Sequence, residues 1–202
     1  MPSPLSVICP KCHGIAEFQF AICRHIARKQ DQAFFETSKS SEVFKPAYGH
    51  RLAIHYPGLN HSIKEEDLPD GYKAKMWSHD FFSHRGRQYN VTGNPDTLGV
   101  IRCIRCAYQK KHTLRWPEDA YFQVEYKGKH LWAYDRETTM KLLNSIESKE
   151  RRKGINGYIP TKTHKIPIRG IDNFLHKVPS HFLTKSAREK VAKKLRLKLK
   201  PQ

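Results

Sequence analysis

Two Cys-x-x-Cys pairs constrain this 202-residue chain more than any other feature. The first pair lies in Cys9-Pro10-Lys11-Cys12, and the second lies in Cys103-Ile104-Arg105-Cys106. At this spacing, two thiolates can bind one metal ion from the same side, and two such turns supply the four sulfurs of a tetrahedral shell. The sequence therefore predicts one structural Zn²⁺ that joins the N-terminus to the middle of the chain, with these ligands: Cys9, Cys12, Cys103 and Cys106.

The cysteine count agrees with a metal site in a reducing compartment. Cys23 is the fifth cysteine, and an odd number suits one zinc site plus a buried thiol better than a secreted disulfide framework. The first residues lack the basic start and apolar core of a signal peptide, so we expect a cytoplasmic protein with reduced thiols. Two alternatives stay open: two unrelated turns with reduced thiols, and a redox dithiol.

The segment between the two turns is long, because 90 residues separate Cys12 from Cys103. The entropy of loop closure grows only logarithmically with length, so an insertion of this size is tolerated. It must, however, hold secondary structure of its own. The first turn runs into Ile15–Ile22, where apolar residues alternate with Glu17 and Gln19, and this period of two predicts a half-buried strand.

A Cys-x-x-Cys turn that runs into a strand resembles the zinc knuckle of zinc-ribbon proteins. The resemblance covers roughly residues 6–22 and 98–116, and it implies a split four-cysteine metal site in a nucleic-acid-binding protein. Two positions depart from the commonest knuckle. His13 and Ala107 stand where a glycine often follows the second cysteine.

A hairpin and a helix follow the second knuckle. Alternation in Tyr121–Tyr126 and in His130–Tyr134, with Lys127-Gly128 between them, predicts a tight β-hairpin. Asp135 is the expected N-cap of the next helix. The apolar stripe expected to face inward comprises Met140, Leu143 and Ile146.

The sequence thus predicts an α+β fold. Its parts are a zinc-ribbon-like β core with a long insertion between the two knuckles, a β-hairpin plus helix, and a basic C-terminal helical arm. The expected domains are residues 1–150, with the insertion at about 23–97, and residues 151–202 for the C-terminal arm and helix.

The formal net charge of +18 is concentrated in the C-terminal quarter, where residues 151–202 hold 15 lysines and arginines against two acidic residues. Such a concentration favours binding to a polyanion through phosphate contacts. The last helix is expected to begin at a capping box, Ser186–Glu189, with Ala187, Val191 and Leu195 on its apolar face. The predicted phosphate contacts are Arg151, Arg152, Lys153, Lys190, Lys193, Lys194 and Arg196.

The combination predicts a nucleic-acid-binding protein, with DNA slightly ahead of RNA. An alternative is a protein–protein adaptor that docks through its C-terminal helix. A membrane role is disfavoured, because no stretch approaches the roughly 20 apolar residues of a bilayer span.

A further alternative is a metal-dependent nuclease. Zinc nucleases of the His-Asn-His type also pair Cys-x-x-Cys turns, and the candidate catalytic residues would be His79 or His84, supported by Asn90 or Asn94. His79-Asp80 has the reverse of the usual order, and no nucleophile motif is present, so no catalytic residue is assigned.

Overall fold

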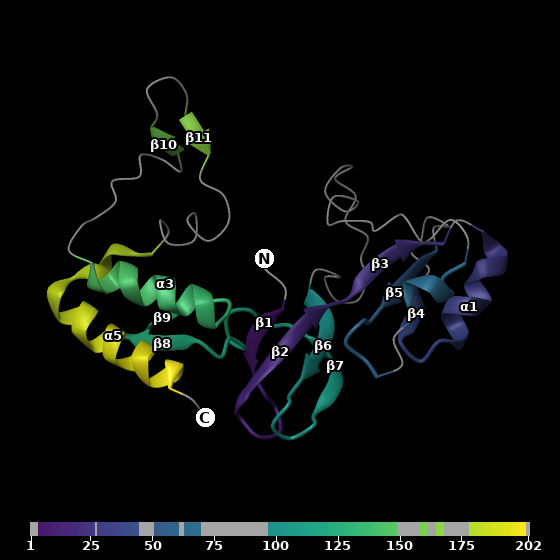
Figure 1. The fold of residues 1–202 in the computed structure, drawn as a ribbon, viewed down its shortest axis with the longest axis horizontal. Coiled ribbons are helices and arrows are strands. Elements are labelled where there is room, and N and C mark those ends of the chain that lie inside the picture. The colour runs from purple at the N-terminus through teal and green to yellow at the C-terminus, as the bar shows by residue number, and fades with distance from the viewer. Residues whose placement is uncertain are drawn as a thin grey trace. The chain divides into compact units, whose positions relative to one another are not determined.

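The computed structural model describes residues 4–26, 28–44, 51–60, 63–69, 97–148, 158–160, 165–167 and 178–200. The chain divides into two compact units, Pro2–Asp119 and Ala120–Gln202. Antiparallel sheets and three α-helices make up the described structure, which confirms the α+β class (Figure 1). Among the described residues, no helix has the length and apolar character needed to cross a bilayer.

The first unit is built on a four-stranded antiparallel sheet in the order β1-β2-β6-β7. Its strands are β1 (Leu5–Ile8), β2 (Ile15–Phe20), β6 (Leu98–Arg102) and β7 (Gln109–Thr113). Each Cys-x-x-Cys turn joins the two strands of one hairpin. Glu17, near the start of β2, pairs with Arg102 at the end of β6, so the antiparallel register brings both turns to the same end of the sheet.

Strand β2 carries the predicted alternation. Phe18 is fully buried, whereas Glu17 and Gln19 are exposed. The strand ends at Phe20, two residues earlier than predicted, because the chain then enters a second sheet in which Ile22 pairs with His55. The continuous strand expected over residues 15–22 is therefore split between two sheets.

The insertion has a sheet and a core of its own. Strands β3 (Ile22–His25), β4 (Ser41–Phe44) and β5 (Leu52–His55) form an antiparallel sheet in the order β3-β5-β4. Helix α1 (Gln32–Thr37) precedes β4, and short 3-10 turns cover Lys29–Asp31 and Glu65–Asp67. The buried cluster of this sheet comprises Ile26, Phe35, Ala53 and Leu68. A second buried cluster, of Ile54 and Tyr56 with Val100 of β6, packs the insertion against the four-stranded sheet.

The predicted hairpin opens the second unit. Strands β8 (Gln123–Tyr126) and β9 (Lys129–Trp132) pair in register, which confirms the prediction. Lys127 and Gly128 between them have φ angles of 52° and 70°. Positive φ at both central residues defines a type I′ turn, whose twist matches that of the flanking strands.

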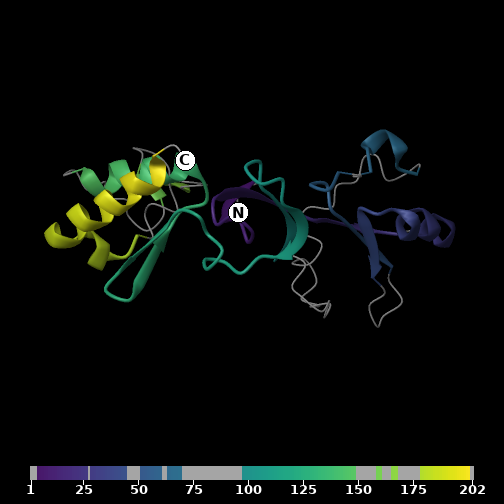
Figure 2. The ribbon, with the colours of Figure 1, turned by 90° about the horizontal axis from the view of Figure 1, so that it is seen from below.

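Two helices lie on one face of this hairpin (Figure 2). Helix α3 (Arg136–Glu147) begins at Asp135, whose side chain accepts a hydrogen bond from the Thr138 backbone N–H at 2.7 Å. Helix α5 (Lys185–Leu199) follows a 3-10 turn at Ser180–Leu183. A short antiparallel pair, β10 (Tyr158–Pro160) and β11 (Lys165–Pro167), lies between the two helices in the sequence.

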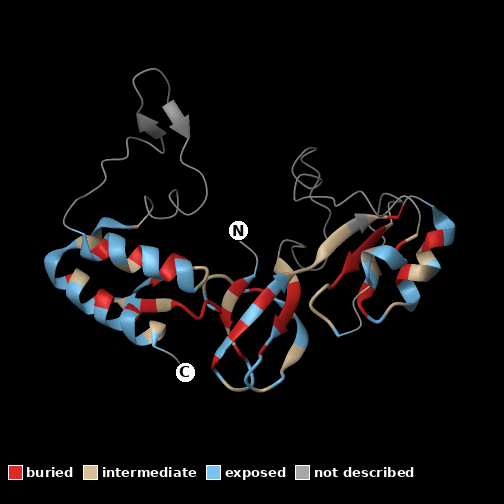
Figure 3. Ribbon diagram, in the orientation of Figure 1, coloured by how far each residue is buried: buried red, intermediate tan, exposed pale blue. Residues whose placement is uncertain are grey.

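Two details of the helices differ from expectation. Met140 is 51% exposed, and the residues of α3 that face inward are Thr138, Thr139, Leu142 and Ile146. The N-cap of α5 is Thr184 rather than the predicted box at Ser186–Glu189. The predicted apolar face of α5 is confirmed, because Ala187, Val191 and Leu195 are all buried (Figure 3).

Helix α3 packs against α5, and α5 packs against β8, so the hairpin and the two helices form the core of the second unit. The predicted domain boundary at about residue 150 lies outside the described residues and stays a prediction.

Gly99 in β6 has no room for a side chain in the four-stranded sheet. A Cβ at this position would lie 2.3 Å from the Gln19 carbonyl oxygen and 2.4 Å from the Phe18 ring. We expect Gly99→Ala to lower the free energy of unfolding by about 1–3 kcal/mol, as overpacking of a buried site does. Chemical denaturation measures the change. Gly14→Ala is the matched control, because its Cβ would meet only ordinary contacts at 3.5 Å or more; equal losses in both variants would contradict the steric explanation.

Candidate metal centre

The two knuckles have matching backbone geometry. In the first, the Cys9 N–H donates to the Gly14 carbonyl at 2.8 Å; in the second, the Cys103 N–H donates to the Tyr108 carbonyl at 2.8 Å. Each bond spans five residues and closes the turn at the end of its hairpin. The two loops therefore present their cysteines in the same way, although they are separated by most of the first unit's sequence.

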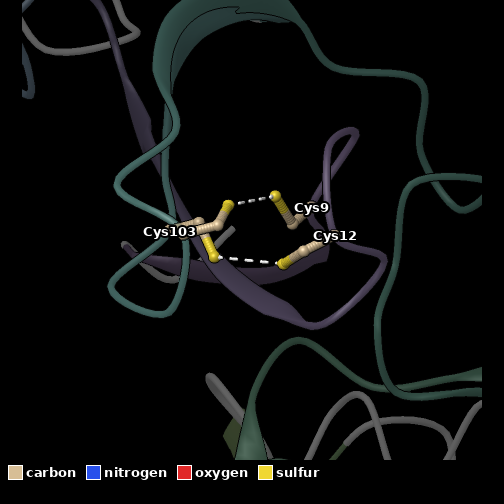
Figure 4. A group of neighbouring side chains, drawn as sticks. Cys9, Cys12 and Cys103 are labelled. Atoms are coloured by element: carbon tan, nitrogen blue, oxygen red, sulfur yellow. Dashed lines mark hydrogen bonds between the residues drawn. The ribbon is translucent and has the colours of Figure 1, made fainter.

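The four cysteine sulfurs lie together between these loops (Figure 4). The distance from Cys9 Sγ to Cys106 Sγ is 3.6 Å, and the distance from Cys12 Sγ to Cys103 Sγ is also 3.6 Å. All four sulfurs lie within 4.8 Å of one another. Sulfurs placed about 2.3 Å from a central ion at tetrahedral corners are about 3.8 Å apart, so the cluster fits one four-coordinate metal ion.

The cluster consists of the cysteines alone among the residues that the structure describes. Cys9 and Cys103 are buried, whereas Cys12 and Cys106 are partly exposed. Cys23 lies in β3 of the other sheet and is not a member. All five cysteines are free of disulfides. The four residues predicted to bind metal from their spacing are thus the four that the fold brings together.

The residue after each second cysteine adopts a left-handed conformation. His13 has a φ of 58° and Ala107 a φ of 54°. This conformation disfavours a side chain, because Cβ approaches the following carbonyl, and it accounts for the frequent glycine at this knuckle position. The two departures noted in the sequence therefore leave the knuckle backbone intact at the expense of local strain.

The thiols of the cluster differ in acidity. Burial alone raises the pKa of Cys9, but hydrogen bonds from the backbone N–H groups of Cys12 and Lys11 outweigh it and lower the pKa to about 7. Burial raises the pKa of Cys106 to about 12, and the adjacent cysteine side chains add to this effect. Because coordination requires thiolates, a metal ion must displace protons from this site, and its affinity should rise with pH.

A hydrogen-bond network at Asp119 joins the strand that leads into the first knuckle to β7. Asp119 accepts hydrogen bonds from His112 Nε2 and from the Arg115 backbone N–H, each at 2.8 Å. Its own backbone carbonyl accepts from the N–H of Ile8, the residue before Cys9, at 2.9 Å. Burial would raise the pKa of Asp119, but the hydrogen bonds and positive charges of His112 and Arg115 outweigh it and lower the pKa. The network joins β1, β7 and the turn after β7.

The predicted phosphate-contacting residues fall into two groups. Arg151, Arg152 and Lys153 lie outside the described residues, as do the nuclease candidates His79, His84, Asn90 and Asn94. The remaining four lie on α5 and are exposed: Lys190, Lys193, Lys194 and Arg196.

Sequence reasoning missed two features of the centre. The Asp119 network depends on pairing between distant strands, and the sequence signals it only weakly, through the Pro117-Glu118-Asp119 turn. The exposure of Ile104, at 85%, follows from its place at the outer end of the second knuckle. An apolar residue between two metal-binding cysteines could have drawn attention to this position.

Comparison with known proteins finds no match among family models, curated sequences or solved structures. The functional argument therefore depends on the geometry of the chain itself.

Removing one ligand should release the metal and unfold the first unit. Elemental analysis is expected to find about one metal ion per chain, and Cys9→Ser or Cys103→Ser should abolish binding. The matched control is Cys23→Ser, because Cys23 lies outside the cluster and its variant should keep the metal. Full metal content in Cys9→Ser, or its loss in Cys23→Ser, would contradict the assignment.

The left-handed residue of the second knuckle offers a test of local strain. Ala107 is exposed, so Ala107→Gly removes the clash of Cβ without opening a cavity. We expect a gain of up to about 1 kcal/mol, because relief of about 1–2 kcal/mol is partly offset by glycine's greater unfolded-state entropy. Ala33→Gly on the exposed face of α1 should instead lose up to about 1 kcal/mol. Thermal unfolding of the metal-loaded variants measures both signs.

Proposed function

We propose that this chain binds nucleic acid, DNA ahead of RNA, through basic surfaces on a scaffold that a structural zinc ion stabilises. The metal part of the proposal follows from donor chemistry. Four thiolates form the soft, tetrahedral set that zinc occupies in structural sites. They leave no coordination position for water or substrate, so the ion holds the knuckles together and takes no part in a reaction.

The exposed face of α5 carries the nucleic-acid part of the proposal. The helix holds seven basic residues and a single acidic residue, Glu189, so its surface is strongly positive. Lys190 and Lys193 are exposed and form no ion pair or hydrogen bond with another described residue. Cations without an internal partner are available to phosphates, and each phosphate contact releases counterions.

Two other cations of α5 are already used within the second unit. The Lys194 ammonium donates to the Glu125 carbonyl at 2.6 Å, and the Arg196 guanidinium pairs with the Glu147 carboxylate at 2.5 Å. These contacts anchor α5 to the hairpin and to α3. We therefore expect Lys190 and Lys193 to contribute more to phosphate binding than Lys194 and Arg196.

The adaptor alternative draws support from a different observation on the same helix. Leu197 is 55% exposed near the lysines of α5, and an exposed apolar residue can contact a protein partner. The two functions differ in their response to salt. The logarithm of the affinity for phosphates falls linearly with the logarithm of the salt concentration, whereas the affinity of an apolar protein contact does not fall in this way.

Fluorescence anisotropy with labelled DNA and RNA oligonucleotides at several salt concentrations tests the proposal. We call the slope of the logarithm of affinity against the logarithm of salt concentration the salt slope. We expect Lys190→Ala/Lys193→Ala to weaken binding and to reduce the magnitude of the salt slope by about two, one for each lost phosphate contact. The matched control is Lys194→Ala/Arg196→Ala, which removes the same charge from the same helix but should change the slope less.

Affinity that does not change with salt would count against phosphate binding and would favour the adaptor. Incubation of the protein with plasmid and Mg²⁺ is the separate test for nuclease activity.

A further inference from the structure

The outer ends of the two knuckles form a single surface of the first unit. We call it the knuckle tip and define it by the exposed residues Pro10, Lys11, His13, Ile15, Ile104 and Arg105. The loops are in direct contact there. A Cβ on Gly14 would lie 3.5 Å from Arg105 Nη1, and the Cys103 sulfur lies 3.7 Å from the Ile15 carbonyl oxygen. Residues from opposite ends of the unit's sequence therefore share one surface.

The knuckle tip combines exposed apolar groups with positive charge. Ile104 is 85% exposed and Ile15 is 40% exposed. Single exposed apolar residues are common and need no explanation. Here, however, Ile104 directly precedes Arg105, and Lys11 and His13 are exposed on the adjoining loop. Neither turn contains an acidic residue.

The loops that carry these side chains are held at both ends. Cys103 and Cys106 flank Ile104 and Arg105 directly, and Cys9 and Cys12 flank Lys11 in the same way. A loop fixed by its metal ligands and by a closing backbone hydrogen bond loses little conformational entropy when it binds a partner. The metal site thus makes the knuckle tip a pre-organised contact surface.

We infer that the knuckle tip is a second nucleic-acid contact, in which Ile104 packs against bases or sugars while Lys11 and Arg105 meet the phosphates on either side. This inference rests on the proposed function and adds a surface separate from α5. Charge complementarity selects the occupant. A purely apolar protein pocket would have to desolvate the adjacent cations, whereas a nucleic acid offers apolar surface between two rows of phosphates.

The test uses the full-length, metal-loaded protein and a labelled oligonucleotide of about 20 nucleotides, single-stranded and as a duplex. Ile104→Ala should weaken binding by about fivefold to thirtyfold, the loss expected when most of an isoleucine's apolar contact is removed. The salt slope should stay unchanged, because no charge is lost. The matched apolar control is Met140→Ala, a 51% exposed residue on α3, which should bind as the parent does.

Substitution of the charged residues of the knuckle tip should change the salt slope, which Ile104→Ala leaves unchanged. Lys11→Ala or Arg105→Ala should each reduce the salt slope by about 0.7–0.9, the value for one phosphate contact on a single strand or a duplex. Lys39→Ala, an exposed lysine in the turn before β4, is the charge control and should leave the slope unchanged. Metal content and thermal stability of each variant confirm that the centre is intact.

The outcomes separate this inference from the proposed function. If the parent binds with a steep salt dependence and Ile104→Ala binds equally well, the knuckle-tip contact is wrong while binding through α5 stands. If the parent binds neither strand form, both proposals fail. If Ile104→Ala binds the oligonucleotides as the parent does but no longer binds a protein partner that the parent binds, the surface is a protein-docking site and the inference is overturned.

Discussion

The convergence of four cysteine sulfurs is the interaction on which the first unit depends. It joins two hairpins, β1–β2 and β6–β7, that are separated by an insertion with its own sheet. Pairing of β2 with β6 brings the turns to one end of the sheet, and the sulfurs lie close enough there for one ion to bind all four. Because four thiolates of like charge repel one another, a cation bound at this position would contribute its binding free energy to folding.

The described part of the second unit is held together by packing of helices and a hairpin. A two-stranded hairpin is marginally stable at best in water, so β8 and β9 need cover: α5 packs against β8, and α3 packs against α5. This requirement uses the apolar face of α5 and leaves its basic face, with the exposed Leu197, for a partner. Lys194 and Arg196 lie at the border between the two roles, because they bind Glu125 and Glu147 within the unit.

Several strained or crowded positions among the described residues of the first unit shape the four-stranded sheet and its knuckles. His13 and Ala107 adopt left-handed conformations that let each knuckle turn around the sulfurs. Gly99 lets β6 approach Phe18 closely, and the Asp119 network fixes the strand before Cys9. The same rigidity places Ile104 and Arg105 at a fixed outer surface, which is why a structural metal site can also shape a binding surface.

Local patterns in the sequence determined the two Cys-x-x-Cys turns, the strand at β2, the tight hairpin and the buried face of α5. Spacing and periodicity were sufficient for these features because each depends on residues a few positions apart; the pairing of β2 with β6 then brought the two cysteine pairs together. Only the tertiary structure decided that the strand after the first knuckle divides between two sheets, and that α5 packs against both α3 and β8. It also decided which residue capped α5 and which face of α3 turned inward. The packing outcomes depend on contacts between segments tens of residues apart. Several apolar surfaces could make such contacts, and the residues near each surface do not show which of them will pair.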